Sequence, residues 1–373
     1  MTALALWFAL LAVQDDELVA LTNLRILTVT RGEIEQGTIV IQGGKFLAAG
    51  ADVKTPPGCR IVDGKGLVAF PGMVHPHSRL GIFEVSSTGG STPLHLAYDE
   101  LNPSLDVFSQ SLRSGFTTFG VLPTGGGIAG QGVILKPAGG SRDELVLEKA
   151  GFLRIVLQPG SAGKEAIRQA LEAARKAIEA EKKTPAAKPD EKTLPLARFL
   201  RGELPGIVET AGPSELLHFW QVMEGFTEFK PRVSYAGSPD AYKAASELGA
   251  RKARVILRPL LSLAPFTRER INPGAELAKV GVEVAFAPFG DGPEAYQGCL
   301  FRVSELVKFG LSRETALRAL TIVPAEMMGV EKRVGSIEAG KDADLLLFSG
   351  DPLSPQSRLR DVYINGKQVF HGE

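Results

Sequence analysis

The sequence is poor in the two side chains that most often hold transition metals. Its 373 residues include two cysteines and five histidines. Cys59 and Cys299 lie far apart in unrelated segments, which argues against a disulfide framework and a cysteine-based zinc site, and we interpret both as core or loop residues. The histidines are His75, His77, His95, His218 and His371. They are too few and too scattered to predict a histidine-rich metal centre.

The sequence also lacks an excess of charge of either sign. Lysine plus arginine and aspartate plus glutamate number 42 each, so the formal net charge is +0. No basic surplus is available to neutralise a phosphate backbone, and we expect no nucleic-acid partner. The length predicts one large domain with an accessory rather than a string of small modules.

Long apolar runs are missing except at the start. Residues 1–13 form an apolar run that ends abruptly at Gln14 and three acidic residues. The run is shorter than the roughly 20 residues that cross a bilayer, but it has the length of a signal-peptide core. We therefore predict a signal peptide over residues 1–14 and a secreted or periplasmic protein without a membrane span. Because no Lys or Arg precedes the run, a buried N-terminal strand or helix in a cytoplasmic protein stays open as the alternative.

Strand-like patterns at both ends of the chain enclose a long mixed middle. Residues 18–68 alternate apolar and polar side chains between glycine-rich turns, which is typical of a β-meander. The pattern returns near the C-terminus, where Asn365-Gly366 predicts a hairpin turn. In the middle, strand-like runs alternate with amphipathic stretches such as residues 164–183, which an exposed linker over residues 184–192 follows. This order predicts a parallel sheet with outer helices, either open or closed into a barrel, with function at the C-terminal strand ends.

Several motifs resemble the amidohydrolase superfamily, in particular its imidazolonepropionase-like branch. They are Val62-Asp63-Gly64-Lys65-Gly66, the stretch from Pro71 to Gly81, residues 101–103, residues 115–136 and residues 316–353. The resemblance covers nearly the whole chain from Leu18. It implies an α/β fold in which residues 71–340 form a (β/α)8 TIM-like barrel. Residues 15–70 and 341–373 would together form a small composite β-sandwich.

The resemblance also implies metal ligands at the ends of the barrel strands. The family places two histidines on strand 1, one each on strands 5 and 6, and an aspartate on strand 8. The metal activates water and polarises the carbonyl of a non-peptide, cyclic amide-like C–N bond, while the aspartate moves protons. In this chain His77 and Asp291 stand at two of these positions. The replaced positions are Arg79 on strand 1, Glu209 and Ala211 on strand 5, and Ala236 on strand 6.

The remaining residues allow two interpretations of the site. In the first, His77 and Asp291 form a weak metal pair that Glu209 or His75 completes, with zinc or iron as the metal that the resemblance suggests. In the second, no cofactor binds, and Arg79 pairs with Asp291 at the barrel mouth, where its guanidinium supplies the positive charge of the missing metal. We favour the second interpretation, because a positive Arg79 opposes a divalent cation and cannot itself ligate one.

Two other motifs predict no chemistry. The glycine-rich segment from Gly125 to Gly132 lacks the Gly-Lys-Ser/Thr ending of a phosphate loop, and we predict a loop at the pocket rim. The serines and threonines of residues 86–92 lack the G-x-S-x-G context of a nucleophile elbow.

Three functions stay open at this point. The first is a degenerate amidohydrolase homologue that binds a small molecule or a protein partner without metal-dependent turnover. The second is an active hydrolase with a reduced site around His77 and Asp291. The third is a non-catalytic subunit that pairs with an intact paralogue. As partners, a small molecule, a paralogue or further copies of the same chain are all open. A shared barrel does not choose among the three functions, because one fold hosts many chemistries.

Overall fold

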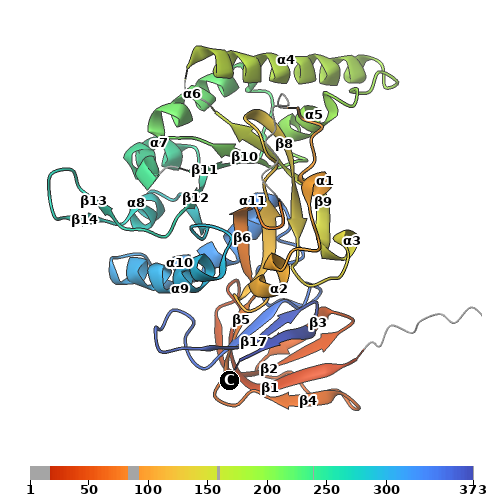
Figure 1. Ribbon diagram of the computed structural model, residues 1–373, viewed down its shortest axis with the longest axis vertical. Helices are drawn as coiled ribbons and strands as arrows, with labels where there is room; N and C mark the ends of the chain where they lie inside the picture. Colours follow the sequence, from red (N-terminus) through yellow and green to blue (C-terminus); the bar gives the residue numbers. More distant parts are fainter. Residues whose placement is uncertain (1–16, 83–91, 158–159, 238, 373) are drawn as a thin grey trace, which may run out of the picture.

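The computed structural model describes residues 17–82, 92–157, 160–237 and 239–372. The predicted signal peptide lies outside these residues, as does nearly all of the 86–92 stretch. Within the described ranges, no helix combines the length and apolar character that crossing a bilayer demands. Two eight-stranded sheets organise the molecule, one in a larger body and one in a smaller body below it in Figure 1.

The sheet of the larger body curls into a nearly closed barrel. Its strands follow the order β15-β12-β11-β10-β9-β8-β7-β6, and the two end strands β15 and β6 contact each other. They are β6 (Met73–Ser78), β7 (Phe116–Val121), β8 (Gly127–Leu135), β9 (Val146–Val156), β10 (Gly206–Glu209), β11 (Val233–Ala236), β12 (Arg254–Leu257) and β15 (Glu283–Phe286). The predicted mixed α/β fold with a barrel-like sheet is confirmed.

Strand β8 corrects two predictions, the all-parallel barrel and the glycine-rich rim loop. It takes up residues 127–132 of the glycine-rich segment and runs antiparallel to both β7 and β9. The glycines are needed because neighbouring groups approach the backbone closely. A Cβ on Gly132 would come within 2.1 Å of the Phe152 ring, and Gly130, at φ +131°, lies against the His95 carbonyl. The glycines therefore shape a buried strand with register shifts rather than a loop.

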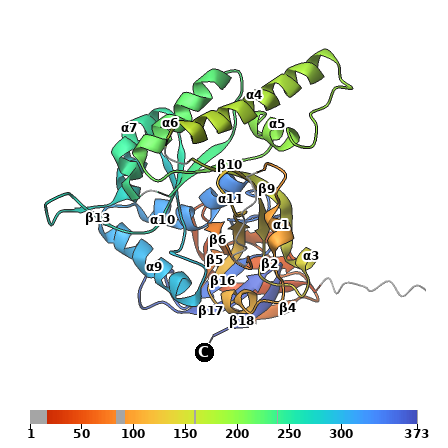
Figure 2. The same ribbon diagram turned by 45° about the horizontal axis from the view of Figure 1, so that its top comes forward.

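Helices surround the barrel sheet. They are α1 (Ala97–Glu100), α2 (Val107–Ser111), α3 (Arg142–Leu145), α4 (Ser161–Lys183), α5 (Leu194–Leu200), α6 (Pro213–Met223), η1 (Glu224–Phe226), η2 (Pro239–Ala244), α7 (Ala245–Ala250), α8 (Pro273–Lys279), α9 (Pro293–Lys308), α10 (Arg313–Leu320) and α11 (Ile322–Met328). Helix α4 confirms the predicted amphipathic helix: it buries Ile167, Leu171, Ala174 and Ile178, which share one face at helical spacing. The small hairpin of β13 (Ser262–Leu263) and β14 (Arg270–Ile271) projects from the body in both views (Figures 1 and 2).

Both ends of the chain meet in the sheet of the smaller body. Its order is β18-β17-β16-β5-β1-β2-β3, with β4 paired to β1. The strands are β1 (Val19–Leu27), β2 (Glu33–Gln42), β3 (Lys45–Gly50), β4 (Arg60–Asp63), β5 (Val68–Pro71), β16 (Leu345–Phe348), β17 (Leu359–Ile364) and β18 (Lys367–His371). The junction is the antiparallel pairing of β16 with β5. The predicted β-sandwich would need two facing sheet layers, and that arrangement stays a prediction.

The predicted hairpin turn joins β17 to β18. Asn365 has φ 49° and Gly366 has φ 73°, so both central residues adopt the left-handed conformation of a tight hairpin turn. The same turn holds Asn365 beside a buried lysine from the barrel.

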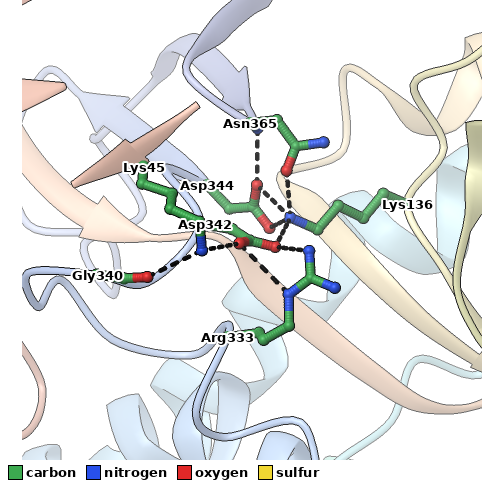
Figure 3. A network of polar contacts seen from close by, with 7 residues as sticks. All are labelled: Lys45, Lys136, Arg333, Gly340, Asp342, Asp344 and Asn365. Carbon is green, nitrogen blue, oxygen red and sulfur yellow. Dashed lines mark hydrogen bonds and ion pairs between the residues drawn. The ribbon is translucent and has the colours of Figure 1, made fainter. Parts of the chain in front are cut away.

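A buried ionic network, which we call the joint, fastens the two bodies together (Figure 3). Lys136, directly after β8, places its Nζ 2.9 Å from Asp342 Oδ2, 3.0 Å from Asp344 Oδ1 and 2.6 Å from Asn365 Oδ1. Arg333 Nη2 donates to Asp342 Oδ2 at 2.7 Å. Burial raises the pKa of Asp344, and the neighbouring Lys136 opposes that shift. The Asp-Ala-Asp of the C-terminal motif is therefore a structural fastening.

Candidate functional site

The predicted site residues gather at one end of the barrel, which we call the mouth. His77 lies near the end of β6, Glu209 is the last residue of β10, and Asp291 follows β15. The parallel strands end at the same edge of the sheet, so these side chains from distant parts of the sequence become neighbours. Of the remaining positions, Ala236 is buried as the last residue of β11, and Ala211 is exposed just beyond β10.

Glu209 lies at the centre of one polar group. Its Oε1 is 2.8 Å from His77 Nε2 and accepts a hydrogen bond from Arg154 Nε at 3.0 Å, while its Oε2 accepts from Arg154 Nη2 at 2.7 Å. Arg154 Nη1 donates to the carbonyls of Pro123 and Gly125, which fixes the guanidinium. Burial acts to raise the pKa of Glu209, but the hydrogen bonds from His77 and Arg154 outweigh it and lower the pKa to about 2. Glu209 is thus a fully ionised, fully paired carboxylate.

Asp291 lies at the centre of a second polar group. Its Oδ1 accepts from the Ser78 hydroxyl at 2.6 Å and from the Tyr296 hydroxyl at 3.3 Å. Its Oδ2 accepts from the backbone N–H of Arg79 at 2.7 Å. Both oxygens are therefore engaged by donors from β6 and α9.

The predicted ion pair between Arg79 and Asp291 is wrong in its chemistry. The two residues are neighbours, as expected, but the contact uses the main chain of Arg79. In the described part of the chain the Arg79 guanidinium forms no salt bridge, and the residue is exposed. Because β6 ends here, the backbone N–H is free to cap the carboxylate, which leaves the long side chain to solvent.

His75 is a buried, neutral member of the site. Its Nδ1 accepts the backbone N–H of His77 at 3.3 Å, so its proton resides on Nε2, 3.5 Å from Asp291 Oδ1. Its ring packs near the rings of Phe116, Phe119 and Tyr296, at 5.8 to 6.3 Å between centroids. Burial, with the nearby side chains of His77 and Arg258, lowers its pKa well below the ordinary value.

Sequence analysis missed two arginines of the mouth. Arg154 lies within β9, and Arg258 directly follows β12. Burial lowers the pKa of Arg258, opposed by the charges of Asp291 and Glu209, and its Nη1 is buried without a hydrogen-bond partner among the described residues. A signal was available, since Arg154 interrupts the apolar run of residues 152–157 and Arg258 directly follows the apolar run of β12, and a buried cation demands a partner.

The donor set does not fit a divalent metal ion. No group of three or more His, Cys, Asp or Glu side chains with metal-binding geometry occurs in the described ranges. His77 Nε2 and both oxygens of Glu209 are committed to one another or to Arg154, and Asp291 is committed to Ser78 and the Arg79 backbone. The mouth therefore consists of two hydrogen-bonded groups, one centred on Glu209 with Arg154 and His77, the other on Asp291.

Comparisons with known proteins agree on the superfamily. The model of the amidohydrolase family matches residues 297–370. An imidazolonepropionase of Caldanaerobacter subterraneus is 30% identical over 129 residues, which cover 34% of this chain and 26% of that protein. A 5-methylthioadenosine/S-adenosylhomocysteine deaminase of Thermodesulfovibrio yellowstonii is 36% identical over 124 residues, which cover 27% and 28% of the two chains. This chain thus matches only about a quarter of the length of these relatives.

A solved structure extends the similarity to nearly the whole chain. The crystal structure of an amidohydrolase from Thermotoga maritima superposes with a TM-score of 0.81 and 24% identity, covering 95% of this chain and 100% of that one. At this identity the superposition shows a shared fold.

Proposed function

We propose that this chain, a member of the amidohydrolase superfamily, carries out no metal-dependent hydrolysis. The carrying observation is the pairing of Glu209 with both His77 and Arg154. A metal ion entering the mouth would have to displace a fixed guanidinium from a carboxylate that two hydrogen-bonding partners already hold ionised.

In this proposal arginine side chains supply the positive charge that a metal ion would otherwise bring to the carboxylates. A metal would neutralise the carboxylates that face the barrel axis, and here Arg154 neutralises Glu209 directly at 2.7 Å. Arg258 supplies a second positive charge, next to Asp291. The carboxylates are thus stable in the fold without a metal, and the Lewis acid that polarises a scissile carbonyl is not provided.

The experiment is a hydrolysis assay on the full chain with a panel of cyclic amides, after purification in zinc or iron and removal of unbound metal. We expect no turnover above a His77→Ala, Asp291→Asn double variant. Turnover that the double variant lacks and that a chelator abolishes would establish the alternative, an active hydrolase around His77 and Asp291.

We also propose that the protein is exported and that a signal peptide is removed. The apolar run of residues 1–13 supports this, and N-terminal sequencing of protein from its native cell should begin near residue 15. An intact Met1 would contradict export.

The alternative of a non-catalytic subunit has a separate test. If a metal-bearing paralogue co-purifies with the chain, that alternative is favoured.

A further inference from the structure

A small cavity lies where the larger and the smaller body meet, beside helix α9. Its volume is about 280 Å³, just below the range of drug-sized pockets, so it has room for a small ligand. One wall is formed by α9 and by the turn before β7, and the other by residues 349–358, which join β16 to β17 and run under α9 in Figure 1. Tyr296 lines it too, but its hydroxyl donates to Asp291 at the mouth. We call this space the side cavity.

The lining of the side cavity carries positive charge and no negative charge. Its charged residues are Arg113 and Arg358, which are both exposed. Within the described part of the chain neither guanidinium forms a hydrogen bond or a salt bridge, and that of Arg113 lies 5.9 Å from the centre of the Phe370 ring. The acid of the nearby segment, Asp351, is paired with Arg313 at 2.6 Å. Two cations without a counter-charge at one cavity favour a ligand that brings negative charge.

Neutral hydrogen-bond donors of the same lining are also unused. Ser357 Oγ is buried and has no hydrogen-bond partner among the described residues. The Ser354 hydroxyl accepts the backbone N–H of Gln356 at 3.4 Å but donates to no group of the described chain. Because a buried hydroxyl is normally hydrogen-bonded, the free Oγ of Ser357 indicates a partner that comes from outside the chain.

The wall that carries these serines is held in shape by its own contacts. The backbone N–H of Ser357 donates to the Ser354 carbonyl at 3.0 Å, and that of Arg358 donates to Ser349 Oγ at 2.9 Å. The turn over residues 349–358 is therefore formed before a ligand arrives, which lowers the ordering cost of binding.

We propose that the side cavity binds a phosphate group, as free inorganic phosphate or as a small phosphate ester. Arg113 comes from the larger body, whereas Arg358 and the serine hydroxyls come from the smaller body, so that donors face the ligand from two walls. A tetrahedral phosphate presents oxygens to both walls, whereas a planar carboxylate presents its two oxygens to one side. The partly exposed Leu300 and Leu353 line the same cavity and would contact the alkyl part of an ester.

The test is a calorimetric titration of the full chain at constant ionic strength. The ligands are inorganic phosphate, butyl phosphate and a carboxylate with an alkyl chain, butyrate. We expect saturable binding of a phosphate ligand and about tenfold weaker binding of butyrate, because butyrate has fewer acceptor oxygens and less charge. Tighter binding of butyl phosphate than of inorganic phosphate would identify an ester as the ligand, and the reverse order would identify free phosphate.

Variants then test which donors act. Arg113→Gln and Arg358→Gln should each weaken binding of the tighter phosphate ligand, and the double variant should weaken it by about tenfold or more. Ser357→Ala should weaken it by about fivefold, the effect of one hydrogen bond. Arg302→Gln is the matched control, because it removes a cation of α9 that lies over the Phe289 ring and does not line the cavity, and it should leave binding unchanged.

Thermal unfolding of each variant checks that it folds, which we expect because the three arginines are exposed. The proposal fails if neither phosphate ligand binds saturably, or if butyrate binds as tightly as both. It also fails if the double arginine variant binds like wild type, or if Arg302→Gln weakens binding as much as the double variant.

Discussion

The joint and the mouth both gather charges from distant parts of the chain, but they satisfy them differently. At the joint, Lys136 has three acceptors for its three N–H donors, and its side chain is 4% exposed. At the mouth, Glu209 and Asp291 are 17% and 21% exposed, and Arg258 keeps a buried Nη1 without a partner in the described structure.

The two networks therefore differ in the exposure of their charges and in the pairing of one arginine, Arg258. Buried charges that serve stability alone are expected to be fully paired, because an unpaired one is expensive. At the mouth the unpaired atom belongs to Arg258, since Glu209 and Asp291 are both hydrogen-bonded; at the joint Asp344 Oδ2 has no hydrogen bond but lies 2.8 Å from Lys136 Nζ.

Removing the lysine of the joint should have the largest effect. Lys136→Met leaves Asp342 and Asp344 buried without their central cation, and we expect a loss of about 3–5 kcal/mol in the free energy of unfolding. Lys45→Met is the matched control, since Lys45 pairs with the same Asp342 at 3.4 Å but is 55% exposed, and it should lose about 1 kcal/mol or less. Urea unfolding of both variants measures the difference, and equal losses would remove the distinction on which the comparison rests.

Acid should weaken the mouth through Glu209. The pKa of Glu209 is lowered to about 2 from 4.5, so on acidification the unfolded chain takes up this proton first. Its contribution, on the order of 3 kcal/mol, is complete above pH about 4.5 and is lost as the pH falls toward 2. The stability gap between wild type and Glu209→Gln should therefore be wide at pH 6 and narrow at pH 3. Glu179→Gln, on the exposed face of α4, should show no such change, and a gap that is constant with pH would contradict the pairing.

Removing the unpaired guanidinium should have little effect. Arg258→Met deletes a half-buried charge whose Nη1 has no acceptor, so the lost desolvation penalty offsets the lost attraction to Asp291. We expect thermal unfolding to show a change within about 1 kcal/mol, in contrast to Lys136→Met. A loss as large as that of Lys136→Met would show that Arg258 is as fully integrated as the lysine of the joint.

Restoring one histidine should have the smallest effect of all. Arg79→His returns the second strand 1 position to the family pattern, but Glu209, Ala211 and Ala236 still provide no histidine on β10 and β11. We expect no zinc uptake in a calorimetric titration of this variant. Stoichiometric uptake of zinc would show that a single substitution is enough to create a metal site at the mouth.

The sequence predicted the main parts of the molecule for identifiable reasons. Helix α4 follows from apolar spacing and the β17–β18 turn from Asn365-Gly366. The nearness of His77, Glu209 and Asp291 follows from the family resemblance, which places all three at barrel strand ends. Strand β8 was not predicted, because its glycines are required by the close approach of Phe152 and His95, which are distant in sequence. The partners of each charge were also missed: pairing Arg154 with Glu209 depends on which strands are neighbours and on side-chain length.

The most direct test of the account is elemental analysis of the purified full chain after growth in medium supplied with zinc and iron. If the carboxylates of the mouth are satisfied by Arg154, Ser78 and the Arg79 backbone, the protein should contain well under one equivalent of either metal, and His77→Ala should not change that value. Close to one equivalent of zinc or iron in wild type, lost in His77→Ala, would contradict the account.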